Sequence, residues 1–350
     1  EDFTEGSEEP GELGVSEEAL GLYLRLAYIP APYALLQNTH MLEPGSWIRV
    51  GADAGTRRGR FFVFPAAAPP SLRGEEAVEA VDAAVTAAVR RQLVSDVPVG
   101  AFLSGGIDSP LVVAKMRDAC GGRMRTFTIG TGDDATDESG DAIAYARDLG
   151  VEHTVEHVSA GEALAMLKDV VEACGEPFGD YSMFPTMLVS RLASREFKVM
   201  LSGDGGDELF WGYVGRAVPI LRAGQEFARP AWWRRSRWAM RRALRRADGH
   251  SHLLLGSIGE WHCAAHTHLP RSWLSRVFPS LPPWPAAYDV FDYTGVEPDA
   301  TARWLRWNEF VSHLTMVLMK VDRASMYHSL EVRVPLLDRE VIEVASHVDW

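Results

Sequence analysis

The sequence has 350 residues, of which 47% are hydrophobic and 24% charged, as in an ordinary globular protein of about two domains. Its formal net charge of −13 argues against a nucleic-acid-binding surface, and no apolar run is long enough to predict a membrane span. The odd number of cysteines, with no CxxC pair, argues against a disulfide framework and favours a reducing, cytoplasmic compartment: Cys120, Cys174 and Cys263.

The N-terminal part predicts a helix and a pair of strands. Residues 16–28 have helical apolar spacing, with Ser16 as the cap. Residues 45–65 read as two short strands around a Gly-rich turn. A linker with Pro65, Pro69 and Pro70 follows.

From Leu72 onward, apolar strands alternate with amphipathic helices. This alternation predicts an α/β fold with a doubly wound parallel sheet covered on both faces. Residues 215–315 lose the alternation and predict a helical lobe. The expected strands are 97–103, 125–131, 152–159 and 197–203, and the expected helices are 75–93, 108–119, 138–149, 161–173 and 184–195.

The first candidate site follows the strand at 97–103. A Ser-Gly-Gly turn opens a helix there, so backbone N–H groups and the helix dipole can hold an anion. An aspartate would repel a bare phosphate, and its natural partner is Mg²⁺ bridging to phosphates. The alternative is a Gly-rich turn with a capping aspartate, and no Walker A motif occurs in the chain. The motif reads Leu103-Ser104-Gly105-Gly106-Ile107-Asp108-Ser109.

The second candidate site repeats this design after the strand at 197–203. Asp204, Asp207 and Glu208 crowd one helix start, which is costly unless a cation or a substrate amine neutralises them. A structural turn needs only one of them, as a cap. Because parallel strands present their carboxyl ends at one edge, Asp108 and Asp207 are expected to face one Mg²⁺.

A third stretch, Lys320–Met326 continuing through LEVRVPLLD to Asp338, reads as a helix that ends in a charged turn. Surface ion pairing explains its charges equally well.

Together SGGIDS, LSGDGGDELFWGY and KVDRASM…LEVRVPLLD resemble the glutamine-hydrolysing asparagine synthetase family, in its order and spacing. The SGGxDS loop alone resembles the wider superfamily of ATP pyrophosphatases. The resemblance implies a sheet of the adenine-nucleotide alpha-hydrolase type, with ATP and Mg²⁺ as cofactors. It also implies that a carboxylate attacks the α-phosphorus of ATP, and that an amine then converts the acyl-AMP into an amide.

The resemblance also implies roles for individual residues. Asp108 and Asp207 would bind Mg²⁺, and Asp204 and Glu208 would lie near the acceptor or act as a base, with Tyr213 ending the motif. Residues of the first loop would contact the phosphates of ATP: Ser104, Gly105, Gly106, Asp108 and Ser109. Four further residues would flank its adenine: Leu103, Ile129, Ser202 and Gly203.

The chain departs from the family pattern at both ends. Residues 1–71 contain no cysteine nucleophile and resemble only the last strands of a glutaminase domain and its linker. Residues 72–350 are expected to form the synthetase domain. A lysine that follows the third motif in the family is expected to be missing after Asp338, which predicts a truncated C-terminal end. Free ammonia would then replace glutamine as nitrogen donor.

Two further clusters invite other interpretations. Residues 229–246 form a basic, Trp-rich helix, expected to be solvated rather than bound to lipid or nucleic acid. His262 and His266 lie at i and i+4, with Cys263 and His268 beside them. A zinc site there needs a further ligand, which the sequence does not indicate.

The sequence therefore predicts ATP-dependent amidation of aspartate or a related carboxylate by a cytoplasmic enzyme that contacts neither membrane nor nucleic acid. Two alternatives stay open. One is a lactam or macrolactam synthetase, or an amidotransferase acting on a saccharide or peptide. The other is a non-catalytic nucleotide-binding protein. A homodimer is also left open.

Overall fold

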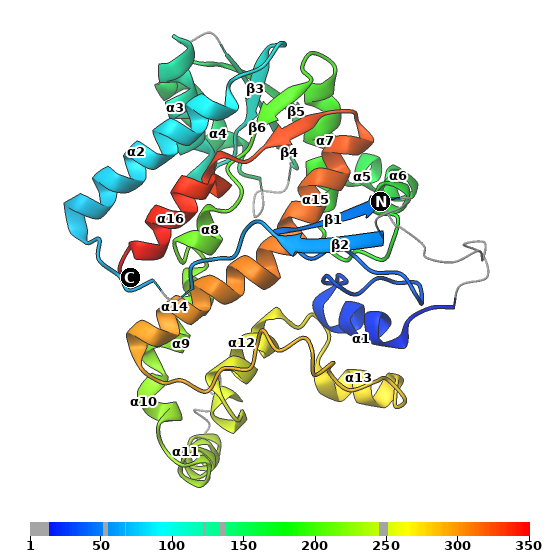
Figure 1. The fold of residues 1–350 in the computed structure, drawn as a ribbon, viewed down its shortest axis with the longest axis vertical. Helices are drawn as coiled ribbons and strands as arrows, with labels where there is room; N and C mark the ends of the chain where they lie inside the picture. Colours follow the sequence, from blue (N-terminus) through cyan, green and yellow to red (C-terminus); the bar gives the residue numbers. More distant parts are fainter. Residues whose placement is uncertain (1–13, 52–54, 67, 122–123, 133–136, 245–250) are drawn as a thin grey trace.

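A five-stranded parallel sheet forms the centre of the protein (Figure 1). The structure, a computed structural model, describes residues 14–51, 55–66, 68–121, 124–132, 137–244 and 251–350. The chain adds strands outward from β3 to β4 and β5, then returns to add β6 and β7 on the other side. The predicted α/β fold with a doubly wound parallel sheet is confirmed. The order across the sheet is β5 (Glu152–His157), β4 (Arg125–Gly130), β3 (Val99–Phe102), β6 (Val199–Leu201), β7 (Glu331–Arg333).

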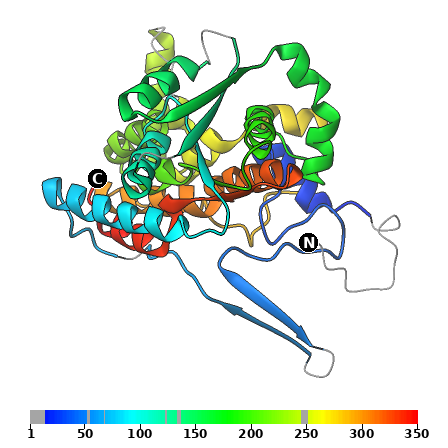
Figure 2. The same cartoon turned by 90° about the horizontal axis from the view of Figure 1, so that it is seen from above.

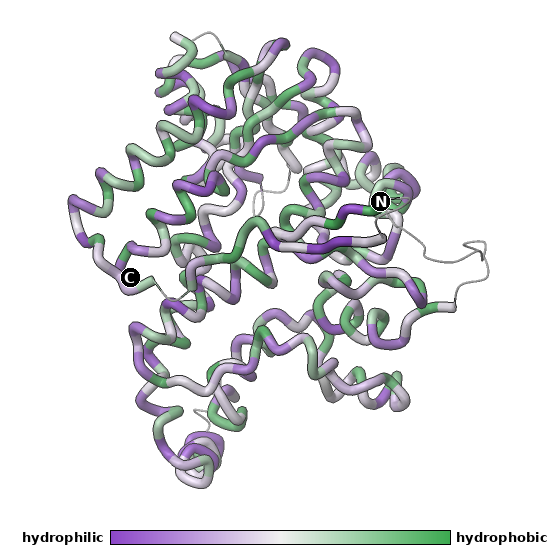
Figure 3. The backbone as a smooth tube through the Cα atoms, viewed as in Figure 1, coloured by the Kyte–Doolittle hydropathy of each residue, from purple (hydrophilic) through white to green (hydrophobic). Residues whose placement is uncertain are grey.

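Helices cover both faces of the sheet because strand side chains alternate between them. Ala101 and Leu201 pack on one side, and Phe127 and Met200 on the other. Hydrophobic residues dominate the central strands. In the outer helix α2, hydrophobic and hydrophilic residues alternate along the chain (Figure 3). The first face is covered by α2 (Gly74–Gln92), α3 (Asp108–Cys120), α4 (Ser139–Leu149) and α16 (Arg339–His347), and the second by α6 (Leu167–Cys174), α7 (Met183–Ser194) and α15 (Leu314–Tyr327). Helix α5 (Ala160–Ala165) precedes α6 and buries none of its residues.

Strand β7 was not predicted. The sequence around it reads as a charged turn after a helix, but Glu331–Arg333 pairs in parallel with β6. The Arg333 carbonyl also accepts from the Ser202 N–H at 2.9 Å, where the second loop begins. The third motif therefore extends the sheet and anchors that loop.

The N-terminal elements lie where the sequence predicts them. Helix α1 (Glu17–Leu26) starts at Ser16, whose hydroxyl accepts from the Ala19 N–H at 3.3 Å. Strands β1 (Ser46–Gly51) and β2 (Gly55–Arg60) form an antiparallel hairpin. The hairpin projects away from the rest of the protein (Figure 2).

The short helix α8 of the second loop is followed by helices over residues 214–244 and 251–313, the expected helical region, which lies below the sheet in Figure 1. Tyr28, just after α1, donates to the Ser312 carbonyl at 2.7 Å and so ties the N-terminal part to this region. No described helix is long and apolar enough to span a membrane. The elements are α8 (Gly206–Leu209), α9 (Val214–Arg222), α10 (Gly224–Phe227), α11 (Ala231–Ala243), a 3-10 turn (Ser251–Leu254), α12 (Ile258–His266), α13 (Arg271–Val277), α14 (Pro298–Asn308) and a π-helical turn (Glu309–His313).

The basic helix α11 buries one arginine and leaves its other arginines exposed or half-exposed. Arg234 is buried and donates to the carbonyls of Leu255 and Gly256. Arg237 pairs with Glu226 at 3.0 Å. The exposed arginines and the Arg237–Glu226 pair fit the expected solvated helix, whereas the burial of Arg234 was not expected; residues 245–250 lie outside the described part of the chain.

Candidate functional site

The two Gly-rich loops lie side by side at the point where the strand order reverses. Strands β3 and β6 are neighbours, and the chain leaves their carboxyl ends through residues 103–107 and 202–205. In open α/β sheets the ligand crevice forms at such a reversal. The predicted convergence of the two loops is present.

Two glycines of the second loop allow it to touch the first. A Cβ at Gly203 would lie 2.5 Å from the Ser109 backbone nitrogen, and one at Gly206 would lie 2.4 Å from the Asp108 Cγ. Neither position has room for a side chain, so glycine is required by contact rather than by backbone conformation.

A third glycine is fixed by conformation as well as by contact. Gly205 has φ +95°, and a Cβ there would lie 2.4 Å from Leu337 Cδ2. Leu337 comes from the third motif, so this motif supports the second loop from beneath.

The loop carboxylates are close enough to raise one another's pKa. Burial, followed by the negative charges of Asp207 and Asp204, raises the pKa of Asp108 to about 6. Burial also raises the pKa of Asp207, while Arg216 lowers it. Asp108, Asp204 and Asp207 do not form a described cluster with three ligand atoms within 4.8 Å. Two carboxylates with phosphate and water oxygens would suit Mg²⁺, which keeps several non-protein ligands.

Three backbone N–H groups of the first loop donate to side chains. Ser104 N–H donates to Ser109 Oγ at 2.8 Å, and Gly106 N–H to Ser104 Oγ at 3.3 Å. Gly105 N–H donates to the Glu138 carboxylate at 3.2 Å. The Glu138 carboxylate thus accepts the Gly105 N–H, and a phosphate that binds there would have to displace it.

The residues predicted to flank adenine are placed differently from one another. Leu103 is buried in the core, and its backbone N–H and carbonyl both bond to β4. Ile129 is half-buried at the end of β4. Ser202 is buried, with an Oγ that has no hydrogen-bond partner. The structure therefore brings Ile129 and Ser202 to this edge, whereas the Leu103 side chain faces the core.

Behind the second loop, the buried Glu208 pairs with the half-buried Tyr213. The Tyr213 hydroxyl donates to Glu208 Oε1 at 2.6 Å. Burial raises the pKa of Glu208 to about 7, despite the opposing hydrogen bond from Tyr213. Burial and the Glu208 charge raise the pKa of Tyr213. Glu208 is 2% exposed, and Tyr213 supplies its side-chain hydrogen bond.

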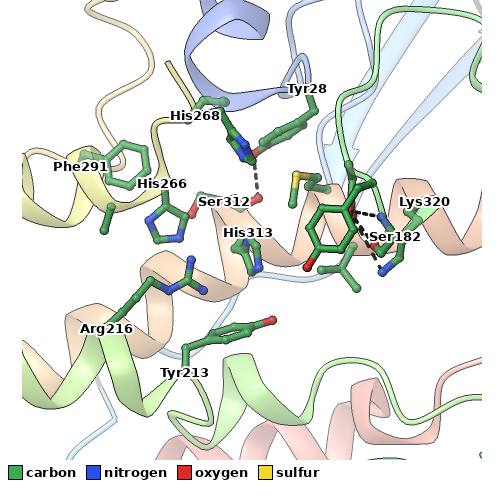
Figure 4. A pocket seen from close by; sticks show the side chains of 16 residues that line it. Tyr28, Ser182, Tyr213, Arg216, His266, His268, Phe291, Ser312, His313 and Lys320 are labelled. Atoms are coloured by element: carbon green, nitrogen blue, oxygen red, sulfur yellow. Dashed lines mark hydrogen bonds and ion pairs between the residues drawn. The ribbon is translucent and has the colours of Figure 1, made fainter. Parts of the chain in front are cut away.

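Tyr213 opens onto a cavity of about 320 Å³ (Figure 4). The Arg216 guanidinium lies 4.3 Å from the Tyr213 ring centroid, and both face the cavity. Lys320 lines the opposite part, with its Nζ 4.0 Å from Asp180 Oδ2. Two cationic groups and one carboxylate in one cavity can orient a small molecule that carries both carboxylate and amine groups.

Sequence reasoning missed most of this cavity. Asp180 and Ser182 stand just before a helix in a stretch read as a connection, although paired polar residues at a helix start are a usable signal. Arg216 lies in the region read only as a helical lobe. Lys320 belongs to the third motif but was given no role.

A buried carboxylate lies behind two of the residues that line the cavity, Arg216 and His266. Glu309, in the π-helical turn, contacts His266 at 3.1 Å, Arg216 at 3.4 Å and His262 at 3.5 Å. Burial would raise the pKa of Glu309, but the His266 hydrogen bond and the nearby cationic groups lower it to about 2. Burial lowers the pKa of His313, which lines the cavity, to about 4.

Comparison with known proteins gives one family and several relatives. The model of the family described as "Asparagine synthase" matches residues 80–350. A putative glutamine-hydrolyzing asparagine synthetase of Mycobacterium tuberculosis (strain H37Rv) is 33% identical, over 95% of this chain and 52% of that protein. Asparagine synthetase 1 of Bacillus subtilis is 27% identical, over 96% of this chain and 54% of that protein.

A solved NH3-dependent NAD synthetase from Campylobacter jejuni is similar at 17% identity with a TM-score of 0.29, covering 39% of this chain and 60% of that one. The chain spans about half the length of the two asparagine synthetases that it matches.

Proposed function

The chain belongs to the asparagine synthase family, and on this premise we propose that it carries the ATP-dependent half of an amide-forming ligase. The observation that carries the proposal is the contact between the two loops, which places Asp108 against Gly206 at the carboxyl edge of the sheet. Residues 72–350 would form the synthetase domain, and residues 1–71 would belong to a preceding unit and its linker.

The first half-reaction would take place at the loop junction. Ser104, Gly105, Gly106 and Ser109 would hold the β- and γ-phosphates, with the N–H of Gly105 released from Glu138. Asp108 and Asp207 would hold Mg²⁺, which supplies positive charge to the departing pyrophosphate. The acceptor carboxylate oxygen would bond to the α-phosphorus as the bond to the pyrophosphate oxygen breaks.

The acceptor would bind in the adjoining cavity. Arg216 and Lys320 suit its carboxylates, and Asp180 suits its amino group. Aspartate carries all three groups and fits this proposal best.

In the second half-reaction ammonia, supplied free or from glutamine, would attack the acyl carbon and release AMP. The nitrogen loses a proton in this step. Asp204 or the Glu208–Tyr213 pair would accept it. The pKa of Glu208, about 7, lies near neutral pH, where a general base works best.

The experiment is ATP–pyrophosphate exchange measured with a panel of carboxylic acids, because exchange reports adenylation without any nitrogen donor. Exchange that depends on aspartate supports the proposal. Exchange only with another acid, such as a β-amino acid or a peptide, makes the chain a lactam synthetase or amidotransferase. Binding of ATP without exchange on any acid would make it a non-catalytic nucleotide-binding protein.

A further inference from the structure

A second group of chemically active side chains lies outside the loops, in the helical region. His262 and His266 project from one face of α12, four residues apart, and Glu309 approaches from the π-helical turn. One ligand atom from each of the three lies within 4.8 Å of the others, and all three residues are buried. Short π-helical segments occur frequently at functional sites.

His262 has an unmet requirement. It is 0% exposed, and neither of its ring nitrogens has a hydrogen-bond partner. Its nearest ionic neighbour is Glu309, whose Oε1 lies 3.5 Å from His262 Nε2. The side chain of Asn308, the residue before Glu309, also lies near the His262 ring, and it bonds the Val290 carbonyl and the Ser312 hydroxyl as well. A buried imidazole without a partner costs free energy, which a bound cation between the rings and the carboxylate would recover.

The spacing suits a tetrahedral metal ion. Bonds of about 2.0–2.1 Å to nitrogen and oxygen place neighbouring ligand atoms roughly 3.3 Å apart. The observed separations from Glu309 are 3.1 Å to His266 Nε2 and 3.5 Å to His262 Nε2. The two rings contact different oxygens of the carboxylate, so an ion between them would be bound by both oxygens or would require the carboxylate to rotate toward one of them.

The surrounding contacts also suit a metal ligand set. His266 Nδ1 lies 3.0 Å from the His262 carbonyl, which directs Nε2 toward Glu309. Metal-binding histidines usually donate their second ring N–H to such a carbonyl. Arg216 Nη2 lies 3.4 Å from Glu309 Oε2, the oxygen that also contacts His266, and ligating carboxylates commonly have such hydrogen-bonding partners.

We propose that His262, His266 and Glu309 bind a divalent transition-metal ion, with zinc as the best match. Two imidazoles and one carboxylate favour zinc over magnesium, which prefers oxygen ligands alone. Water would complete the coordination. The ion would fasten α12 to the π-helical turn, and through His266 and Arg216 it would fix one wall of the acceptor cavity. This assignment does not depend on the proposed ligase activity.

The test is Co²⁺ binding to the whole chelator-treated chain, in excess Mg²⁺ so that oxygen-only sites are occupied. We expect uptake of one Co²⁺ per chain, with the visible absorption of four- or five-coordinate cobalt, and displacement by Zn²⁺. The melting temperature should rise with Zn²⁺ and not with Mg²⁺. His266→Gln and Glu309→Gln should each weaken Co²⁺ binding by at least about tenfold.

Two control variants separate this site from its neighbours. His268→Gln changes a histidine that lines the same cavity outside the cluster, and Asp108→Asn alters the loop junction. Both should bind Co²⁺ as the unmodified chain does. The proposal is overturned if the folded, unmodified chain takes up no stoichiometric Co²⁺. It is equally overturned if uptake survives in the two cluster variants, or is lost in Asp108→Asn.

Discussion

At the residue scale, Asp108 meets two opposed demands. Its carboxylate must be charged to hold a cation, yet it lies half-buried against Gly206 and close to Asp207. Its pKa of about 6 means that ionisation destabilises the folded state. The stability that the protonated group contributes is present below its unfolded pKa and is lost as pH rises through about 6.

Asp108→Asn should therefore separate activity from stability. Exchange activity should fall on the order of 100-fold, because the cation loses a charged ligand. The free energy of unfolding at pH 7 should rise by roughly 1 kcal/mol, after allowance for solvent screening at this position. Exchange rates and urea unfolding measure the two effects. Asp118→Asn, an exposed carboxylate on the same helix α3, is the matched control and should change neither.

A second residue-scale prediction concerns the Glu208–Tyr213 pair. If Glu208 acts as the base, amide formation should increase as pH rises through about 7. The Tyr213 hydrogen bond lowers the pKa of Glu208, so Tyr213→Phe should move this rise to higher pH. Rates of amide formation at a constant concentration of unprotonated amine give the profile.

Tyr293→Phe provides the comparison, since it also removes a phenol hydrogen bond but lies outside the cavity. Its profile should match that of the unmodified chain. A Tyr213→Phe profile that does not move would remove Glu208 from the proton-transfer role.

At the element scale, the site depends on two strand-loop-helix units held in contact. A Cβ at Gly206 would overlap the Asp108 carboxyl group, so Gly206→Ala must displace that carboxylate or the second loop. We expect it to lower exchange activity by displacing the Asp108 carboxylate, and to destabilise the fold by about 1 kcal/mol or less because that side chain can rotate away. The KM for ATP and the unfolding midpoint check this.

Gly161→Ala is the matched control for that change. Gly161 lies in helix α5, where a Cβ meets only ordinary contact at 3.9 Å. It should keep full activity. Equal activity of Gly206→Ala and Gly161→Ala would contradict the proposed junction.

Sequence patterns predict elements best where apolar periodicity is long and turn residues mark the ends. The loops at 103–108 and 202–206 were predictable because an apolar strand runs directly into glycines and carboxylates. Strand β7 was not, because Glu331–Arg333 is a three-residue strand with no apolar run of its own. Only pairing with β6 makes it a strand.

At the scale of the whole molecule, the acceptor cavity joins segments far apart in the sequence. Tyr28, Asp180, Arg216 and Lys320 line one space, although nearly 300 residues separate the first from the last. No local pattern indicates such a meeting, since it follows from packing α1 and the helical region against α15. The same holds for Glu309, which reaches His262 and His266 from another helix.

The central claim is that the two loops hold one cation over one nucleotide. The most direct measurement is the affinity for a nonhydrolysable ATP analogue at saturating Mg²⁺, in a double-mutant cycle of Asp108→Asn and Asp207→Asn. If both carboxylates serve the same ion, the double variant should bind about as weakly as the weaker single variant. Fully additive losses, or Mg²⁺-dependent binding that neither change affects, would contradict the account.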